Sequence, residues 1–141
     1  MKKRQDSRKK KAAETLRRCV RVCVEEIVES TPVDTGEARS NWRVTQAAVN
    51  EAQYPPFDPL PRRTDPDKYY ERRNAAAAKA VCLASLAAIT DDAIVNGVPI
   101  FVQNHIWQTH QLNVGKVLSK QQAPFFVEAA VKLSRGQIDG K

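Results

Sequence analysis

Apolar residues recur at alternating steps of three and four near the start of the chain, which is the spacing of one face of an amphipathic helix. The sequence predicts this helix from Ser7 to about Glu29. The dipeptide Thr31-Pro32 then ends it, because a residue before proline disfavours helical dihedral angles. The residues of the apolar stripe are Ala13, Leu16, Val20, Cys23, Val24, Ile27 and Val28.

The stretch from Asn41 to Ala47 begins with the strict alternation of a half-buried strand. Trp42 and Val44 would point to one side of this strand, whereas Arg43 and Thr45 would point to the other. We therefore expect a strand with one face against the core.

A proline-rich segment, residues 53–67, follows this strand and holds five prolines. Prolines at this density exclude a helix or a central strand, so we expect an extended loop. At its end, Asp65-Pro66 supplies an N-cap carboxylate and a proline at the first helical position, which predicts a helix from there to about Ala88. The second half of that helix is rich in alanine, which favours a buried central helix that another backbone can approach closely.

Shorter elements are predicted in the last third of the chain. Asp91–Val95 favours a strand, Asn96-Gly97 a tight turn, and Val98–Val102 a second extended segment. Pro99 would place this second segment at a sheet edge or leave it incompletely paired.

A short helix is predicted near the end of the chain, beginning at Pro124 and ending before Gly136. Together these elements predict one α+β domain over residues 12–141. In it, the long N-terminal helix and the central alanine-rich helix pack on a small, mostly antiparallel sheet. The expected apolar face of the short C-terminal helix is Phe125, Phe126, Ala129, Ala130 and Leu133.

The positive charge of the chain is concentrated at its beginning. Residues 1–11 hold seven Lys or Arg and one Asp, so +6 of the formal net charge of +7 lies there and +1 remains for the other 130 residues. Such a block predicts a flexible arm that either contacts DNA or an acidic partner, or is simply solvated. Its basic residues are Lys2, Lys3, Arg4, Arg8, Lys9, Lys10 and Lys11.

Composition and hydropathy narrow the class of protein. The chain is 42% apolar and 28% charged, which is ordinary for a soluble globular domain. No apolar run approaches the roughly 18–20 residues of a membrane span, and the basic start is not followed by the apolar region of a signal peptide. We therefore expect a protein of the cytoplasm with no membrane partner.

Three cysteines make an odd count, so a disulfide framework is not expected. Cys19 and Cys23 would lie on the apolar stripe of the first helix, and Cys82 lies among alanines. A zinc site made from Cys19, Cys23, His105 and His110 is the alternative, but the spacings fit no common zinc motif. All three cysteines are therefore interpreted as small buried apolar residues, and no metal or other cofactor is expected.

The sequence contains no arrangement typical of an enzyme. Asp91 and Asp92 could form a pair of acidic groups, but adjacent residues of a strand point to opposite sides and no third acid is placed to help. Phosphate-binding glycine loops, nucleophile elbows and zinc-protease motifs are absent from the sequence. We expect a protein without catalytic residues.

Residues 31–42, TPVDTGEARSNW, carry an unusual density of turn-forming residues. Asp34 can accept hydrogen bonds from the amides that follow it, Gly36 permits a positive φ, and Trp42 can anchor the next strand. Physical reasoning alone therefore predicts a well-specified turn.

This stretch also resembles the opening signature of the tailed-phage neck and tail-completion proteins, often described as minor tail components or head–tail connectors. The similarity rests on Thr31 to Gly36, Ala38-Arg39 and Ser40-Asn41-Trp42. A second block resembles the C-terminal pattern of the same family, and Ile94-Val95-Asn96 with Pro99 resembles a segment between the two. The second block comprises Leu112, Asn113, Gly115, Ser119, Gln122, Ala123, Pro124, Phe126, Val127, Glu128 and Ala130.

The resemblance implies a structural role in the virion. Members of this family form a ring, commonly of six subunits, that joins the portal and connector to the tail tube and lets DNA pass through its lumen. A tail-terminator ring that caps the tail tube is the near alternative. A small basic nucleic-acid-binding module is the alternative from a different class.

The resemblance also assigns expected positions to subunit contacts or to loop shaping. These residues are Pro32, Asp34, Thr35, Gly36, Arg39, Asn41, Trp42, Asn96, Pro99, Asn113, Gly115, Ser119, Gln122, Ala123, Pro124 and Phe126. The partners expected on this basis are other copies of the chain, the neck proteins on the connector side, the tail tube or its terminator, and lumenal DNA.

Overall fold

Helix α1, Lys2–Ser30, is the element around which the others are arranged. The computed structural model describes residues 2–31, 37–57, 74–106, 109–110, 113 and 126–139. The remaining elements follow in chain order: α2 Glu37–Ser40, β1 Arg43–Gln46, α3 Ala75–Ala87, α4 Asp91–Val95, β2 Ile100–Gln103 and α6 Phe126–Asp139. The predicted α+β class is confirmed.

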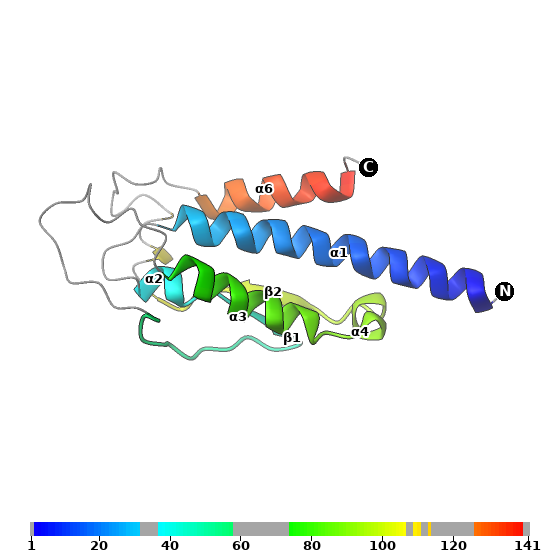
Figure 1. The fold of residues 1–141 in the computed structure, drawn as a ribbon, viewed down its shortest axis with the longest axis horizontal. Helices are drawn as coiled ribbons and strands as arrows, with labels where there is room; N and C mark the ends of the chain where they lie inside the picture. Colours follow the sequence, from blue (N-terminus) through cyan, green and yellow to red (C-terminus); the bar gives the residue numbers. More distant parts are fainter. Residues whose placement is uncertain are drawn as a thin grey trace, which may run out of the picture.

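Helix α1 packs against α6 on one side and against α3 on the other, and both neighbours run antiparallel to it (Figure 1). Its buried face is the predicted stripe, in which Val24, Ile27 and Val28 are almost completely enclosed. The helix begins at Lys2, so residues 2–11, which we expected to be a flexible arm, continue the helical backbone of α1.

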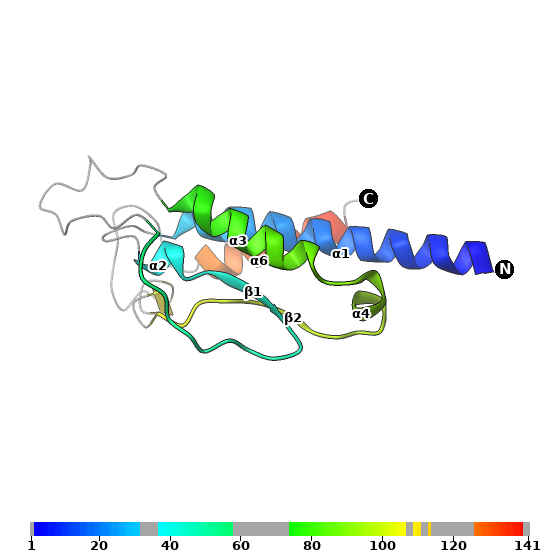
Figure 2. The same ribbon diagram turned by 60° about the horizontal axis from the view of Figure 1, so that its bottom comes forward.

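The sheet consists of β1 and β2 paired antiparallel, as predicted for a small antiparallel sheet. The register sets Val44 opposite Val102 and Arg43 opposite Gln103. Val44 is buried and Val102 packs against the core, so one face of the two strands lies toward the helices. Figure 2 shows the strands below α3 and α1 in that view.

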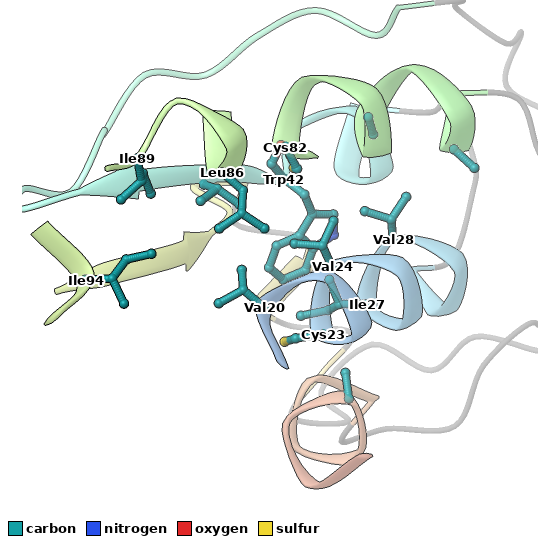
Figure 3. Packing of buried hydrophobic residues seen from close by; sticks show 14 of the residues in the cluster. Val20, Cys23, Val24, Ile27, Val28, Trp42, Cys82, Leu86, Ile89 and Ile94 are labelled. Atoms are coloured by element: carbon teal, nitrogen blue, oxygen red, sulfur yellow. The ribbon is translucent and has the colours of Figure 1, made fainter. Parts of the chain in front are cut away.

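The core lies where α1, α3 and the start of β1 meet. Trp42 occupies its centre, between the α1 side chains Val24 and Ile27 and the α3 side chain Cys82 (Figure 3). Trp42 and Val44 are both 4% exposed, which confirms the predicted inward side of this strand. The large indole therefore holds the two helices and the strand together.

The prediction of a strand at residues 91–95 is wrong, because these residues form the short helix α4. The Thr90 side chain caps the helix by accepting a hydrogen bond from the amide of Ala93 at 3.1 Å. Asp91 and Asp92 lie in its first turn, where negative charge is favourable. The turn after α4 is present, and Gly97 adopts a φ of 78° in it.

Helix α6 differs from the predicted C-terminal helix in its end and in its buried face. It continues through Gly136 to Asp139. Ala130 is buried as predicted, and Ser134 is buried as well, but Ala129 is exposed and Leu133 is 51% exposed, contrary to the prediction. Small residues face α1 because the two helices lie close together along most of α6. Helix α3 is described from Ala75 onward, so its predicted start at Asp65-Pro66 lies outside the described residues.

Candidate functional site

The Arg39 side chain closes the C-terminal end of α1. It is 6% exposed, and its guanidinium donates hydrogen bonds to the main-chain oxygens of Val28 at 3.1 Å, Glu29 at 3.2 Å and Thr31 at 2.9 Å. The last carbonyls of a helix have no partner within the helix and carry partial negative charge. The planar, positively charged guanidinium of arginine can donate hydrogen bonds to several of these carbonyls at once.

Thr31 and Trp42 form the second half of this arrangement. The Thr31 hydroxyl donates to the oxygen of Ile27 at 2.6 Å and accepts from the indole N–H of Trp42 at 2.7 Å. The Cys82 thiol of α3 donates to the Trp42 carbonyl at 3.2 Å. The residues Thr31, Arg39, Asn41 and Trp42, all buried, are called the α1-cap cluster below.

Asn41 and Ser40 attach the segment that follows β1. The Asn41 amide accepts from the Tyr54 amide and donates to the Tyr54 carbonyl, both at 2.7 Å, as a neighbouring strand would. The Ser40 hydroxyl accepts from the amide of Phe57 at 3.2 Å. These hydrogen bonds hold residues 54–57, the first part of the proline-rich segment, against the end of α2 and the residues that link it to β1.

Arg43 packs its guanidinium over the Tyr54 ring at 4.2 Å and over the Phe57 ring at 5.4 Å. It also donates to the carbonyls of Ser40 and Trp42. A cation on an aromatic face adds a modest attraction, about 0.5–1 kcal/mol at exposed sites. Arg43 therefore gives Tyr54 and Phe57 a second attachment to the start of β1.

Two asparagines connect the C-terminal half of the chain to this end of the fold. Asn104 donates to the Ala38 carbonyl of α2 at 2.7 Å and accepts from the amide of Ile106 at 3.0 Å. Asn113 accepts from the Val127 amide in the first turn of α6 at 2.9 Å, so it caps this helix from outside. Its amide nitrogen also donates to the Glu128 carboxylate at 3.0 Å.

The other expected family-signature residues fall into two groups. Asn96 follows α4 at its C-terminal end and is exposed, and the exposed Pro99 accepts from the Ala47 amide at 2.9 Å. Phe126 is the first residue of α6. Pro32, Asp34, Thr35, Gly36, Gly115, Ser119, Gln122, Ala123 and Pro124 lie outside the described residues.

The basic residues of the first turns lie along α1. The side chains of Arg4, Arg8, Lys9, Lys10 and Lys11 are exposed, and Lys2 and Lys3 belong to the helix by their backbone. They are far along α1 from the α1-cap cluster, which lies at its other end.

Burial shifts the pKa of three titratable groups of the core, two cysteines and one arginine. Burial raises the pKa of the Cys82 thiol to about 11, and burial together with the nearby Cys19 raises the pKa of Cys23. Burial lowers the pKa of Arg39, and the charge of Glu29 offsets part of this effect. Asp91 pairs with Arg17 of α1, so it links α4 to the long helix.

Nothing in the described ranges gathers the ligands of a metal ion. No three His, Cys, Asp or Glu side chains come together among the described residues, and His110 is exposed. Within the same part of the chain, every buried side-chain nitrogen or oxygen has a hydrogen-bond partner. The polar atoms of the α1-cap cluster thus serve to position backbone segments.

Sequence reasoning missed several residues that hold this end together. Asn104 bonds to Ala38 and Tyr54 bonds to Asn41, and no local pattern indicates contacts between residues so far apart in the sequence. Ser40 is part of the family resemblance, but its bond to the Phe57 amide was not predicted. The capping role of Thr31 was also missed, although a threonine placed four residues after an apolar helix position can bond back to its carbonyl.

Comparison with protein-family models, with curated proteins and with solved structures found no match. A search of the described residues found no helix long and apolar enough to cross a membrane.

Proposed function

We propose that this chain is a structural subunit of a tailed phage that forms a ring at the head–tail junction. One observation supports this proposal. Several residues that carry the family resemblance hold backbone segments of this fold together through hydrogen bonds. Arg39, Asn41, Trp42 and Asn113 are all buried. Arg39 and Trp42 both bond to Thr31 at the end of α1, Asn41 bonds to Tyr54, and Asn113 bonds to the start of α6.

The arrangement of the chain supports a role in subunit contacts. The C-terminal end of α1, helix α2 and the N-terminal ends of α3 and α6 lie at one end of the molecule (Figures 1 and 2). Phe57 and Ile106, where described ranges stop, are bonded to α2 directly or through Asn104. We infer that the surface contacting neighbouring subunits is built at this end, on the support of the α1-cap cluster.

The mechanism proposed is assembly without catalysis. In a closed ring each subunit uses two surfaces, one for each neighbour, and weak pairwise contacts become strong when the last subunit closes the ring. If the segments that contact neighbouring subunits are held in place before assembly, each contact costs less conformational entropy. The buried and hydrogen-bonded arginine, asparagine and tryptophan side chains of the α1-cap cluster are suited to holding these segments in place.

The deciding experiment is a search for the chain in purified phage particles by mass spectrometry, followed by cryo-electron microscopy of the neck. We expect a ring of this protein between the connector and the tail tube. A ring on the tube side alone would support the tail-terminator alternative. Absence of the chain from the particles would overturn both.

A further inference from the structure

The core-facing stripe of α1 changes from apolar to cationic at Ala13. Ala13 is fully buried, whereas Lys9 and Lys10, four and three residues before it on the same face, are exposed. Figure 1 shows that the N-terminal turns of α1 extend beyond α4 and beyond the end of α6. The first turns of α1 therefore form a projection, and at its base Arg8 and Lys9 border a shallow hollow beside Ile94 and Val95 of α4.

Cations lie around the whole circumference of this projection. Arg4, Arg8 and Lys11 share one side of the helix at spacings of four and three, and Lys9 and Lys10 occupy other sides. All five side chains are exposed. At 1.5 Å per residue they fall within about 10 Å of helix length, which is a high density of positive charge.

The first of these cations, Lys2, Lys3 and Arg4, lie in the first turn of α1, where a helix disfavours positive charge. The first turn of α1 contains no acidic residue, and the N-terminal end of a helix carries about half a positive charge. Arg4 and Arg8 are also a like-charge pair four residues apart. A bound polyanion would remove both penalties, since its negative charge would meet the cations and the helix end together.

We propose that the N-terminal projection of α1 binds the phosphate backbone of double-stranded DNA without reading its sequence. An α-helix with its side chains is about 10–12 Å across, and the major groove of B-form DNA is about 12 Å wide. Cations on all sides of a helix seated there can reach phosphates of both strands. This inference goes beyond the proposed function and does not depend on it.

The composition of the projection disfavours the other ligands that a cationic helix can bind, namely membranes, single-stranded nucleic acids, double-stranded RNA and acidic proteins. Residues 2–11 contain no apolar residue, so the segment lacks the face that an interfacial helix buries in a membrane. It has no aromatic residue on which single-stranded bases could stack. The major groove of double-stranded RNA is too narrow for a helix, and lysine is depleted in protein–protein interfaces.

The test compares two variants of the full chain that lose the same charge. One carries Arg8→Gln, Lys9→Gln, Lys10→Gln and Lys11→Gln in the projection. The control carries Arg18→Gln, Arg21→Gln, Lys132→Gln and Arg135→Gln, which are exposed positions on the body of α1 and on α6. Binding to a labelled duplex of about 24 base pairs is measured by fluorescence anisotropy from about 50 to 200 mM salt.

We expect the projection variant to bind about a hundredfold or more weakly at the lowest salt. The slope of log K against log salt concentration should become less steep by about 3 to 4, since each lost phosphate contact contributes about 0.9. The control should stay within about threefold of the original chain, because distant charges are screened at these salt concentrations. Equal losses in both variants, or an unchanged slope, would overturn the proposal.

Further variants and ligands separate the effect of charge from effects on folding and from binding to other polyanions. The variant Lys9→Arg, Lys10→Arg, Lys11→Arg preserves charge and should preserve both affinity and slope. If the fourfold variant failed to fold by circular dichroism, Arg8→Gln with Lys11→Gln and Lys9→Gln with Lys10→Gln would each be expected to give about half of the slope change. Tighter binding to anionic lipid vesicles or to poly-glutamate than to the duplex would overturn DNA as the ligand.

Discussion

The indole N–H of Trp42 donates a hydrogen bond of 2.7 Å to the Thr31 hydroxyl oxygen. The same hydroxyl donates to the carbonyl of Ile27, so its single proton and one lone pair are both used. Because Thr31 is fully buried and Trp42 is 4% exposed, water cannot replace either bond. The end of α1 is thereby attached to the residue that immediately precedes β1.

Replacing Thr31 by valine should destabilise the fold. Valine preserves the shape but removes the hydroxyl, which leaves the buried Trp42 N–H without its partner. The expected loss in the free energy of unfolding is about 1–3 kcal/mol. Thr31→Ser retains the hydroxyl and should cost less than Thr31→Val. Urea denaturation followed by circular dichroism measures both, and an equal loss for serine and valine would argue against this bond.

Replacing Arg39 by methionine should be more costly. The change keeps much of the side-chain length but leaves the three carbonyls at the end of α1 without their charged donor. We expect a loss of about 3 kcal/mol or more in the free energy of unfolding. Arg18→Met, at an exposed position of the same helix, is the control and should change stability by no more than about 0.5 kcal/mol.

The cap on α6 can be tested with a double-mutant cycle at Asn113 and Glu128. Asn113→Asp keeps the acceptor for the Val127 amide but sets a second carboxylate beside Glu128, so it should cost about 1–2 kcal/mol of stability near neutral pH. Glu128→Gln in the same chain should recover most of that loss. Absence of recovery in chemical denaturation would show that the pair is not coupled.

Ala47 follows β1 with a φ of 70°, in the left-handed region that costs an alanine about 1–2 kcal/mol. Ala47→Gly relieves this strain but adds chain entropy to the unfolded state, so we expect a net gain of about 0.5–1 kcal/mol. The neighbouring exposed Ala48 has no positive φ, and Ala48→Gly should lower stability by a similar amount. Thermal denaturation of the two variants should give shifts of opposite sign.

Stability should fall as the pH rises from about 9 to about 11, because burial raises the pKa of Cys82 from 9.0 to about 11. In that interval the thiol of the unfolded chain releases its proton while the folded chain retains it, so proton release favours unfolding. The contribution is about 2–3 kcal/mol, fully present below pH 9 and lost through pH 11. Cys82→Ala should lose less stability over this interval, and parallel curves for the two proteins would contradict the assignment.

Periodicity predicted the parts of this fold in which one face of an element is buried. The α1 stripe and the inward side of β1 follow directly from the spacing of apolar residues. Residues 91–95 were assigned wrongly because five residues are too few to separate helix from strand by period. Thr90 followed by Asp91 and Asp92 is an N-cap signal that could have indicated the helix.

The buried face of α6 and the contacts of the α1-cap cluster depend on tertiary structure. Of the apolar face expected for α6, Ala130 is buried, whereas Ala129 and Leu133 are exposed. The polar Ser134, which was not expected inside, is also buried and lies beside Cys23 of α1. Arg39 was identified by resemblance alone. Its partners are main-chain oxygens brought within reach by the path of the chain, which a linear pattern does not specify.

The two ends of the described chain lie toward the same end of the molecule, away from α2 (Figure 1). A label fused before α1 would therefore sit on the cationic projection and interfere with it. A label fused after α6 would leave both that projection and the α1-cap end accessible. The 29 residues of α1 separate these two regions by about 43 Å, a distance suited to measuring by energy transfer how each copy would be oriented in the proposed ring.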